Sequence, residues 1–497
     1  MWAGRVGLPI LAGVSDPDSL SREELLAALA QRDAVIAALL VEIEKLKRRV
    51  GMDSSNSSMP PGSDGPSARA KRAKQRKKKP SPRARGGQAG HEGHNLQRVA
   101  HPDLVEVVAP QCCDGCGASL ADRVGRAGRV ASTVQVFDTP PVKLKVTEYQ
   151  MMAVPCTGCG VVTRAVAPAG VAGPCCYGPN VRAATALLAC NGHMSIERAA
   201  DLMGVLLDAP VSTGFTGGLI ARLANTLTGF EDTLKDALRA APVMHHDETP
   251  ARVADDDNDR LLYVYTARAG RLVWFGAADN RGHDALDAFK ILPGYRGTLV
   301  RDDYPAYAKY DKDLKAVQLC CAHLLRSLRG IGELDTDPYR VQRGWTEPAA
   351  AALTDAKAAV AKAKADGAIS LDPDLLTGLR ERYDKAVNWG VLTNRHRDWP
   401  SGRHPGYTLA KRLQDKATQV WRFTVDFAVP FTNNPAEQPQ RMVKLQMKIG
   451  GCWRSVRTAA RYCLVRSYLA TARNHGIHPL DAIRNALAGD PWLPQIA

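Results

Sequence analysis

The chain has 497 residues, of which 45% are hydrophobic, and carries a formal net charge of +15. This length exceeds what a single hydrophobic core supports, so about two to four domains are expected, and the basic excess favours a polyanionic partner, nucleic acid before a membrane surface. The chain has no run of about 18 apolar residues, which argues against a transmembrane helix. The 12 cysteines include CxxC pairs, which indicate metal binding in a reducing cytoplasm rather than a disulfide framework.

A heptad repeat occupies residues 19–50. Ser21-Arg-Glu-Glu24 is a capping box, which predicts the start of a helix. Branched residues then fill one apolar position of each heptad and leucines fill the other: Leu29, Ile36, Ile43 and Val50, with Leu25, Leu39 and Leu46. This arrangement favours a parallel dimer. We predict a short dimerisation coil, interrupted at Arg32; the alternative is a helix packed on its own chain.

A basic linker is expected over residues 51–100. Ser, Pro and Gly are concentrated between residues 54 and 67, and residues 69–85 hold ten Lys or Arg in seventeen positions. The basic residues include Lys71, Arg72, Lys74, Arg76, Lys77, Lys78 and Lys79. Such a run has too few apolar residues to form a core and is expected to be disordered alone. We predict sequence-independent contact with DNA phosphates; a solvated tail is the alternative.

Two CxxC pairs lie within residues 101–172, at Cys113-Asp-Gly-Cys116 and Cys156-Thr-Gly-Cys159. Each contains a glycine that permits a tight turn, and four thiolates at such spacing suit a tetrahedral, structural Zn²⁺. Cys112 adjoins the first pair and is an alternative ligand. The pairs predict a zinc-ribbon domain.

Two further expectations concern this part of the chain. Val142, Leu144 and Val146 alternate with polar residues, which predicts a half-exposed strand inside the ribbon. Four cysteines that lack a CxxC partner are expected to lie in hydrophobic cores: Cys175, Cys176, Cys190 and Cys463.

Residues 178–240 have the periodicity of helices. Residues 195–206 form one predicted helix, and Ser212 is placed to cap a second that continues through Leu219 and Leu223. Two helices across a short turn can be a DNA-binding helix-turn-helix, although Gly217-Gly218 weakens the second. Packing of both helices in a core is the other interpretation, and both stay open.

From residue 241 the hydrophobic period becomes that of strands. The predicted strands are residues 243–247, 261–266, 272–277, 297–302 and 316–320, with a hairpin at Ala269-Gly270 and a short helix over 283–290. Three meandering strands, a helix, then strand, helix and strand is the order of the ribonuclease H-like α/β fold. In that topology the first and fourth strands are parallel neighbours. Asp247 and Asp302, which end them, are therefore expected at one sheet edge, in a first core segment of residues 241–325.

A helical insertion is predicted over residues 326–430, where Ala- and Lys-rich segments include residues 349–365 and 375–389. Residues 431–475 are expected to complete the core, and residues 476–497 to form a helical tail.

The helix that follows the insertion carries a third acid. Thr432-Asn-Asn-Pro-Ala-Glu437 is predicted to cap this helix, along which Glu437, Arg441, Lys444 and Lys448 share one face. A solvated face is one interpretation. Opposite two other carboxylates, Glu437 is better interpreted as a metal ligand and the three bases as DNA-phosphate contacts.

Three clustered carboxylates repel one another unless cations neutralise them. Oxygen ligands suit Mg²⁺ or Mn²⁺, and two such ions about 3.5–4 Å apart activate the attacking oxygen and stabilise the leaving oxygen in phosphoryl transfer. Asp247, Asp302 and Glu437 are thus predicted to form a site that cuts and joins nucleic-acid strands.

The chain resembles the DDE transposases of bacterial insertion sequences, specifically the TnpC-type family, insertion-sequence family sixty-six. The resemblance covers nearly the whole chain and lies in the heptad N-terminus, the CxxC pairs and an ordered set of motifs. These are Ser54-Ser-Asn-Ser-Ser-Met-Pro-Pro-Gly-Ser-Asp-Gly65, Gly86-Gly-Gln-Ala-Gly-His-Glu-Gly-His94, His246-Asp-Glu-Thr-Pro250, Asp302-Asp-Tyr-Pro-Ala-Tyr307, Cys320-Cys-Ala-His323 and Asn433-Asn-Pro-Ala-Glu437.

The resemblance implies a transposase that acts on double-stranded DNA, at element ends and target, as a dimer or higher oligomer in the bacterial cytoplasm at the nucleoid. Asp247, Asp302 and Glu437 take the catalytic positions. Cys320 and His323 match a CxxH element, for which a second structural zinc and the positioning of DNA both stay open. Accessory proteins of the same element are further partners that the resemblance suggests.

Some residues depart from the family pattern. The family has glycine where Asp303 stands and arginine where Gln438 stands, and residues 192–198 are a divergent version of a motif that precedes the first acid. The alternative function is a DNA-binding regulator with a degenerate ribonuclease H-like core, against which the three intact acids argue. A host nuclease for RNA–DNA hybrids would leave the coil, ribbon and insertion unexplained.

Overall fold

The computed structural model describes residues 96–120, 129–255, 258–334, 340–399 and 402–495, with some of residues 21–39. Among these last, residues 30–36 are helical and Leu26, Ile36 and Leu39 are exposed. The other apolar residues of the predicted heptad repeat, Leu25, Leu29, Ile43, Leu46 and Val50, lie outside the described residues. So does the basic run with Lys71, Arg72, Lys74, Arg76, Lys77, Lys78 and Lys79.

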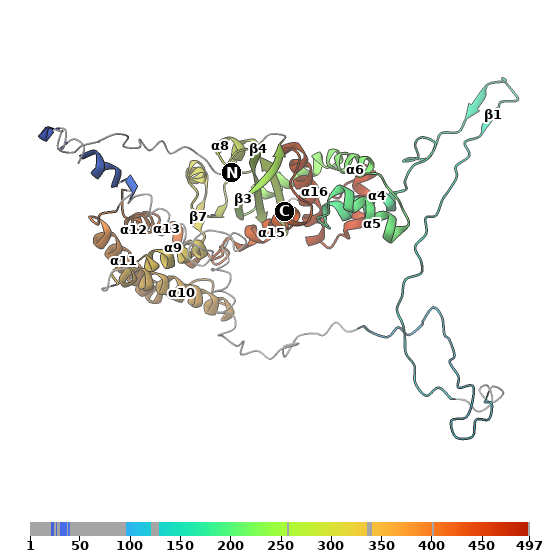
Figure 1. Cartoon of the computed structure of the whole chain (residues 1–497), viewed down its shortest axis with the longest axis horizontal. Helices are drawn as coiled ribbons and strands as arrows, with labels where there is room; N and C mark the ends of the chain where they lie inside the picture. Colours follow the sequence, from blue (N-terminus) through green and yellow to red (C-terminus); the bar gives the residue numbers. More distant parts are fainter. Residues whose placement is uncertain are drawn as a thin grey trace.

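A mixed five-stranded sheet forms the centre of the molecule (Figure 1). Its strands are β3 (Val243–Asp255), β4 (Asn258–Ala269), β5 (Leu272–Ala278), β6 (Thr298–Arg301) and β7 (Ala316–Leu319), in the order β5-β4-β3-β6-β7. The first three form an antiparallel meander, and β6 and β7 run parallel to β3. The predicted parallel pairing of the first and fourth strands is therefore confirmed.

Strand β3 is longer than the sequence predicts. The sequence pattern places its end at Asp247, but the strand continues to Asp255 as one arm of a long hairpin with β4. Its pairing with β6 extends only to His245, so the following residues have a strand on one side alone. Pro250 is tolerated there, because one edge of the strand lacks a ladder that a missing N–H would break.

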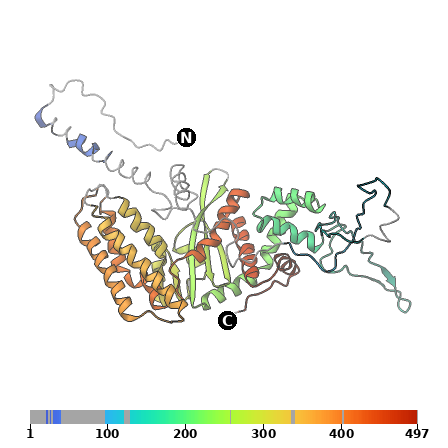
Figure 2. The ribbon, with the colours of Figure 1, turned by 90° about the horizontal axis from the view of Figure 1, so that it is seen from below.

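Helices cover the sheet. Helix α16 (Val456–Asn474) packs along β5, where the Ser467 hydroxyl accepts a hydrogen bond from the Phe275 N–H at 2.8 Å. A group of helices joins this layer: α4 (Pro179–Cys190), α5 (Ile196–Leu207), α6 (Thr213–Thr226), α7 (Thr228–Ala240) and α17 (Pro479–Leu487). Figure 2 shows these helices to one side of the sheet and the helices of residues 326–430 to the opposite side. No described helix is both long and apolar enough to cross a membrane.

Helix α6, the second helix of the predicted helix-turn-helix, packs among other helices. Ser212 caps it as predicted, accepting a hydrogen bond from the Phe215 N–H at 3.0 Å. Leu219 and Leu223 are buried in the main core, where α6 packs on α4, α5, α16 and α17. The structure thus gives α6 a packing role, and a role in the major groove stays a prediction.

The insertion is a helical body with its own hydrophobic core (Figure 2). Its helices are α10 (Arg343–Ala365), α11 (Pro373–Asn394), α12 (Pro405–Asp415), α13 (Ala417–Val420) and α14 (Arg422–Val425), preceded by α9 (Cys321–Glu333). Trp345, Tyr383 and Trp421 are buried in its centre. Val317 and Leu319 of β7 extend this core to the edge of the sheet.

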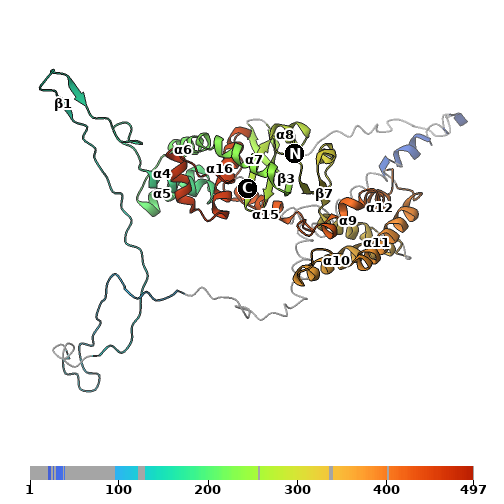
Figure 3. The same cartoon turned by 180° about the vertical axis from the view of Figure 1, so that it is seen from behind.

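Residues 129–177 lead away from the helices to a hairpin of β1 (Ala153–Pro155) and β2 (Val162–Arg164), as Figures 1 and 3 show. The strand predicted around Val142 to Val146 is wrong: these residues are not in a strand and are exposed. Alternating residues form a strand only when a partner strand satisfies their backbone groups.

The structure divides the four cysteines for which a core position is predicted. Cys190 and Cys463 are buried as predicted, whereas Cys175 and Cys176 are exposed. The two exposed cysteines precede α4 in a segment whose residues 172–176 are all exposed, which the cysteine spacing alone does not reveal.

Candidate active site

Three structural elements bring the predicted acids to one edge of the sheet. Asp247 lies in β3, Asp302 directly follows β6, and Glu437 lies in the first turn of α15 (Asn434–Ile449). Parallel neighbours β3 and β6 point the same way, so Asp302 emerges beside Asp247. Alternate residues of a strand share a face. Asp247 therefore faces the same way as Ala251 and Val253, which pack with Val443 of α15.

The carboxyl group of Asp247 is in an environment that disfavours its charge. Burial raises its pKa well above the usual value, and the neighbouring carboxyl groups of Glu248, Asp302 and Glu437 raise it further. Within the described part of the chain, no Lys, Arg or His lies within ion-pair distance of Asp247. A buried carboxyl group that lacks a cationic partner and has other carboxyl groups nearby is typical of a site that binds cations.

Glu248 lies on the opposite face of β3 and is held by protein groups. Arg281 Nε donates a hydrogen bond to Glu248 Oε1 at 2.8 Å, and the Tyr307 hydroxyl donates to Oε2. His246 Nδ1 is 2.8 Å from the same hydroxyl. Arg281 also lies 4.0 Å from Asp302 Oδ2. Glu248 thus reaches the acidic cluster through Arg281, a link that the sequence analysis missed although Glu248 adjoins Asp247.

Asp302 is oriented by its own loop. The Tyr304 N–H donates a hydrogen bond to Asp302 Oδ1 at 3.0 Å, and Arg281 stacks over the Tyr304 ring at 3.8 Å. Burial raises the pKa of Asp302, while the Tyr304 N–H and Arg281 oppose the rise. One oxygen is therefore fixed by the backbone, and the other faces Arg281.

Asn433 joins α15 to β3. Its side chain is fully buried; the amide nitrogen donates to the His246 carbonyl at 2.8 Å and the amide oxygen is 3.0 Å from His245 Nδ1. The sequence predicts that residues 432–437 cap α15. Asn433 does occupy the N-cap position, but its side chain bonds the neighbouring strand and makes no cap hydrogen bond with the helix. This contact sets the position of Glu437 one turn later.

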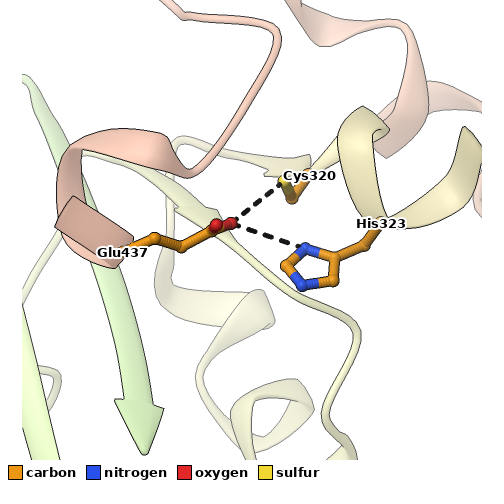
Figure 4. A group of neighbouring side chains, drawn as sticks. All are labelled: Cys320, His323 and Glu437. Atoms are coloured by element: carbon orange, nitrogen blue, oxygen red, sulfur yellow. Dashed lines mark hydrogen bonds and ion pairs between the residues drawn. The ribbon is translucent and has the colours of Figure 1, made fainter. Parts of the chain in front are cut away.

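Cys320 and His323 lie beside Glu437 (Figure 4). Cys320 precedes α9, and its Sγ is 3.9 Å from Glu437 Oε1. His323 Nδ1 is 3.7 Å from the same oxygen. Burial raises the pKa of Cys320 to about 11 and lowers that of His323 to about 4, so both side chains are neutral near pH 7.

Asp303 points away from the cluster, toward the insertion. Its carboxylate pairs with Lys416 at 2.5 Å and Arg412 at 3.5 Å, and lies 3.7 Å from Arg301. The residue that departs from the family pattern is thus part of an ion-pair group that fastens α12 to the end of β6.

The three basic residues of α15 differ in exposure. Arg441 and Lys448 are exposed. Lys444 is half-buried, and its Nζ donates a hydrogen bond to the Pro250 carbonyl of β3 at 3.0 Å. Lys444 therefore has a structural partner as well as the DNA-contact role that the helix pattern predicts.

The two CxxC pairs adopt the same local structure. The Cys113 N–H bonds the Ala118 carbonyl at 2.9 Å, and the Cys156 N–H bonds the Val161 carbonyl at 2.9 Å. Gly117 and Gly160 follow with φ of 71° and 74°, which favours glycine. Backbone N–H groups lower the pKa of Cys113 and Cys156. The two turns do not meet. Among the described residues, Cys320, His323 and Glu437 are the one set of three or more possible metal ligands whose ligand atoms all lie within 4.8 Å of one another, so neither the four CxxC thiols nor the three acids are that close together.

Comparison with known proteins gives the class of enzyme to which the chain belongs. Residues 174–461 match the model of the Transposase IS66 family, and residues 15–97 match a family of unknown function, DUF6444. No curated protein matches the chain. Because the first match spans more than half of the chain, the protein belongs to the Transposase IS66 family, which makes it a nucleic-acid-handling enzyme.

Proposed function

We propose that the chain binds the ends of an insertion sequence and catalyses metal-dependent cleavage and transfer of DNA strands, with Asp247, Asp302 and Glu437 as the catalytic acids. The observation that carries the proposal is the position of the three acids, in β3, directly after its parallel neighbour β6 and in the first turn of α15, where burial and neighbouring carboxyl groups also raise the pKa of Asp247. Membership of a transposase family supplies the class of reaction.

The fold assignment forms part of the proposal. The strand order β5-β4-β3-β6-β7, with α15 and α16 packed on the strands, supports a ribonuclease H-like core of residues 241–325 and 431–475. Residues 326–430 are the insertion and residues 476–497 the tail. Residues 178–240 form a helical region, preceded by the ribbon (101–172), the linker (51–100) and the coil (19–50).

The acidic cluster suits Mg²⁺ or Mn²⁺, because these ions prefer carboxylate oxygens and, among the described residues, Asp247 has no cationic partner within ion-pair distance. Bound ions would supply charge neutralisation for the phosphate and activation of the attacking oxygen. The chain's own residues position the ligands. Asn433 anchors the helix of Glu437, the Tyr304 N–H orients Asp302, and Arg281 bonds Glu248 beside Asp302.

DNA binding and assembly complete the proposal. The basic run over residues 69–85 supplies phosphate contacts for double-stranded DNA, and exposed Arg441 and Lys448 contact the phosphates nearest the acids. The coil over residues 19–50 joins two chains, and one Zn²⁺ held by Cys113, Cys116, Cys156 and Cys159 brings the two CxxC turns together. Accessory proteins of the element are further partners, and the complex acts on bacterial DNA in the cytoplasm.

The test compares single acid variants on a labelled element end with Mg²⁺ or Mn²⁺. Asp247→Asn, Asp302→Asn and Glu437→Gln are each expected to reduce strand cleavage by at least about 10³-fold while DNA binding persists, and double variants are expected to be no worse than singles. Asp303→Asn is the matched control. It is expected to retain cleavage and to lose stability, because its carboxylate pairs with the insertion.

Two results would contradict the proposal: near wild-type cleavage by Glu437→Gln, or an essential Asp303 beside a dispensable Asp302. A DNA-binding regulator is the alternative function. It predicts sequence-specific binding of element ends by wild-type protein without metal-dependent cleavage under any of these conditions.

A further inference from the structure

A second group of ligands adjoins the acidic cluster and includes one of its members. Cys320 lies at the N-terminus of α9, His323 in its first turn, and Glu437 reaches them from α15 (Figure 4). Their ligand atoms all lie within 4.8 Å of one another. Both contacts of Glu437 with this group involve the same oxygen, Oε1.

The spacing of these atoms fits a tetrahedral ion. Zn²⁺ with bonds of about 2.0–2.3 Å holds its ligand atoms about 3.3–3.6 Å apart. The observed separations from Oε1, 3.9 Å to Cys320 Sγ and 3.7 Å to His323 Nδ1, exceed this by a few tenths of an ångström. Small side-chain rotations would close the shell. A thiolate and an imidazole select Zn²⁺ or a similar transition metal over Mg²⁺.

His323 gives an independent indication of a ligand. Its Nδ1 atom is buried and makes no hydrogen bond within the described structure. Buried polar nitrogens in folded proteins are nearly always hydrogen-bonded. The unbonded Nδ1 of His323, 3.7 Å from the Glu437 carboxylate, therefore indicates a missing partner. A metal ion would satisfy this nitrogen and displace the thiol proton of Cys320.

The surroundings of the group favour a metal site over simple packing. The Asn433 N–H donates a hydrogen bond to Cys320 Sγ at 3.2 Å, an arrangement that stabilises a thiolate. A cavity of about 190 Å³ lies alongside and is lined by Asp302, Cys320, His323 and Arg412. This cavity provides an entry path and room for a fourth ligand.

We propose that Cys320, His323 and Glu437 form a transition-metal site of the Zn²⁺ class, distinct from the acidic cluster but sharing Glu437 with it. Only one part of this proposal rests on the proposed function, namely that Glu437 is also a ligand of the acidic cluster. An ion bound to Oε1 partly neutralises the negative charge of the Glu437 carboxylate. Occupancy of this site therefore weakens the attraction of the same carboxylate for Mg²⁺.

The test measures metal binding to the full-length chain without DNA. A background variant carries serine in place of Cys113, Cys116, Cys156 and Cys159, so that the CxxC turns bind nothing. Titration with Co²⁺ is expected to show one ion per chain with thiolate charge-transfer absorption, displaced by Zn²⁺. In this background Cys320→Ser and His323→Gln are each expected to weaken binding by more than about 100-fold, since changes to outer residues alone cost about 10–100-fold.

Two further variants separate this site from the acidic cluster. Glu437→Gln is expected to weaken Co²⁺ binding, whereas Asp247→Asn, which alters only the cluster, is expected to bind Co²⁺ as the background does. Cys463→Ser, which changes a buried cysteine of another core, controls for general disturbance. Circular dichroism checks the fold of each variant.

The proposal is overturned if the background binds no Co²⁺, or if Cys320→Ser and His323→Gln bind it unchanged. It is also overturned if Asp247→Asn weakens binding as much as Glu437→Gln does, because the ion would then occupy the acidic cluster. The proposed transposase function stands or falls on cleavage, which none of these measurements uses.

Discussion

The carboxyl group of Asp247 links stability to pH. Its folded-state pKa is raised by burial and by three neighbouring carboxyl groups. An acid with a raised pKa adds stability that is fully present below its unfolded pKa and is lost as the pH rises through its folded pKa. Without divalent cations, the wild-type protein is therefore expected to lose this contribution above about pH 4, the usual value for an aspartate in an unfolded chain.

Asp247→Asn tests this directly, because asparagine keeps the shape and cannot ionise. The melting temperature of the variant, measured without divalent cations, is expected to exceed that of wild type at pH 8, with a difference that shrinks toward pH 4. Saturating Mg²⁺ should raise the wild-type value at pH 8 and leave the variant nearly unchanged. A difference independent of pH would contradict the assigned electrostatics.

Asn433 provides a second prediction at this scale. Asn433→Ala leaves the His246 carbonyl and His245 Nδ1 without their partner in a buried place, which is expected to lower the free energy of unfolding by about 2–4 kcal/mol. Asn434→Ala, at the neighbouring exposed position, is the matched control and should cost less than about 1 kcal/mol. Urea unfolding of both variants makes the comparison, and equal losses would contradict it.

At the scale of elements, the strands were predictable because their apolar runs and turn signals are local. The pairing of β3 with β6 followed from strand order alone. The length of β3 did not, because its second half pairs with β4 on one side and contacts Lys444 and Trp453, about 200 residues away in the sequence, on the other. The strand predicted around Leu144 is wrong for a related reason. The residues alternate as they would in a strand, but the described structure gives them no neighbouring strand to pair with.

The same distinction separates the site residues. Asp302 and Glu437 could be predicted from their places at a strand end and a helix start, and Asp247 from its place just beyond the part of β3 that pairs with β6. The bonds of Asn433 to β3 and of Asp303 to Lys416 join residues more than 100 positions apart, and no local pattern encodes them. The contact of His323 with Glu437 also joins residues more than 100 positions apart, which explains why the sequence left open whether the CxxH element binds zinc or positions DNA.

At the scale of the whole molecule, charge predicts how the protein holds DNA. Replacing the ten Lys and Arg of residues 69–85 by Gln is expected to flatten the slope of log K against log salt, with little change in sequence preference. The slope should fall by roughly 0.7–0.9 for each phosphate that the protein no longer neutralises. Filter binding or fluorescence anisotropy over a salt series measures the slope. Lys362→Gln with Lys364→Gln, on the insertion, is the control, and an unchanged slope in the linker variant would show that the run does not touch DNA.

The long separation between β3 and α15 also has a consequence during synthesis. Asn433 and His246 are 187 residues apart, so a ribosome translating about 5–20 residues per second takes about 10–40 s to make the chain between them. During that interval the nascent protein holds β3 to β7 and lacks Glu437. A chain released early, by a frameshift or a stop codon within the insertion, keeps the N-terminal basic run but never acquires the third acid. If the proposed function holds, such fragments would bind DNA through the basic run without cutting it.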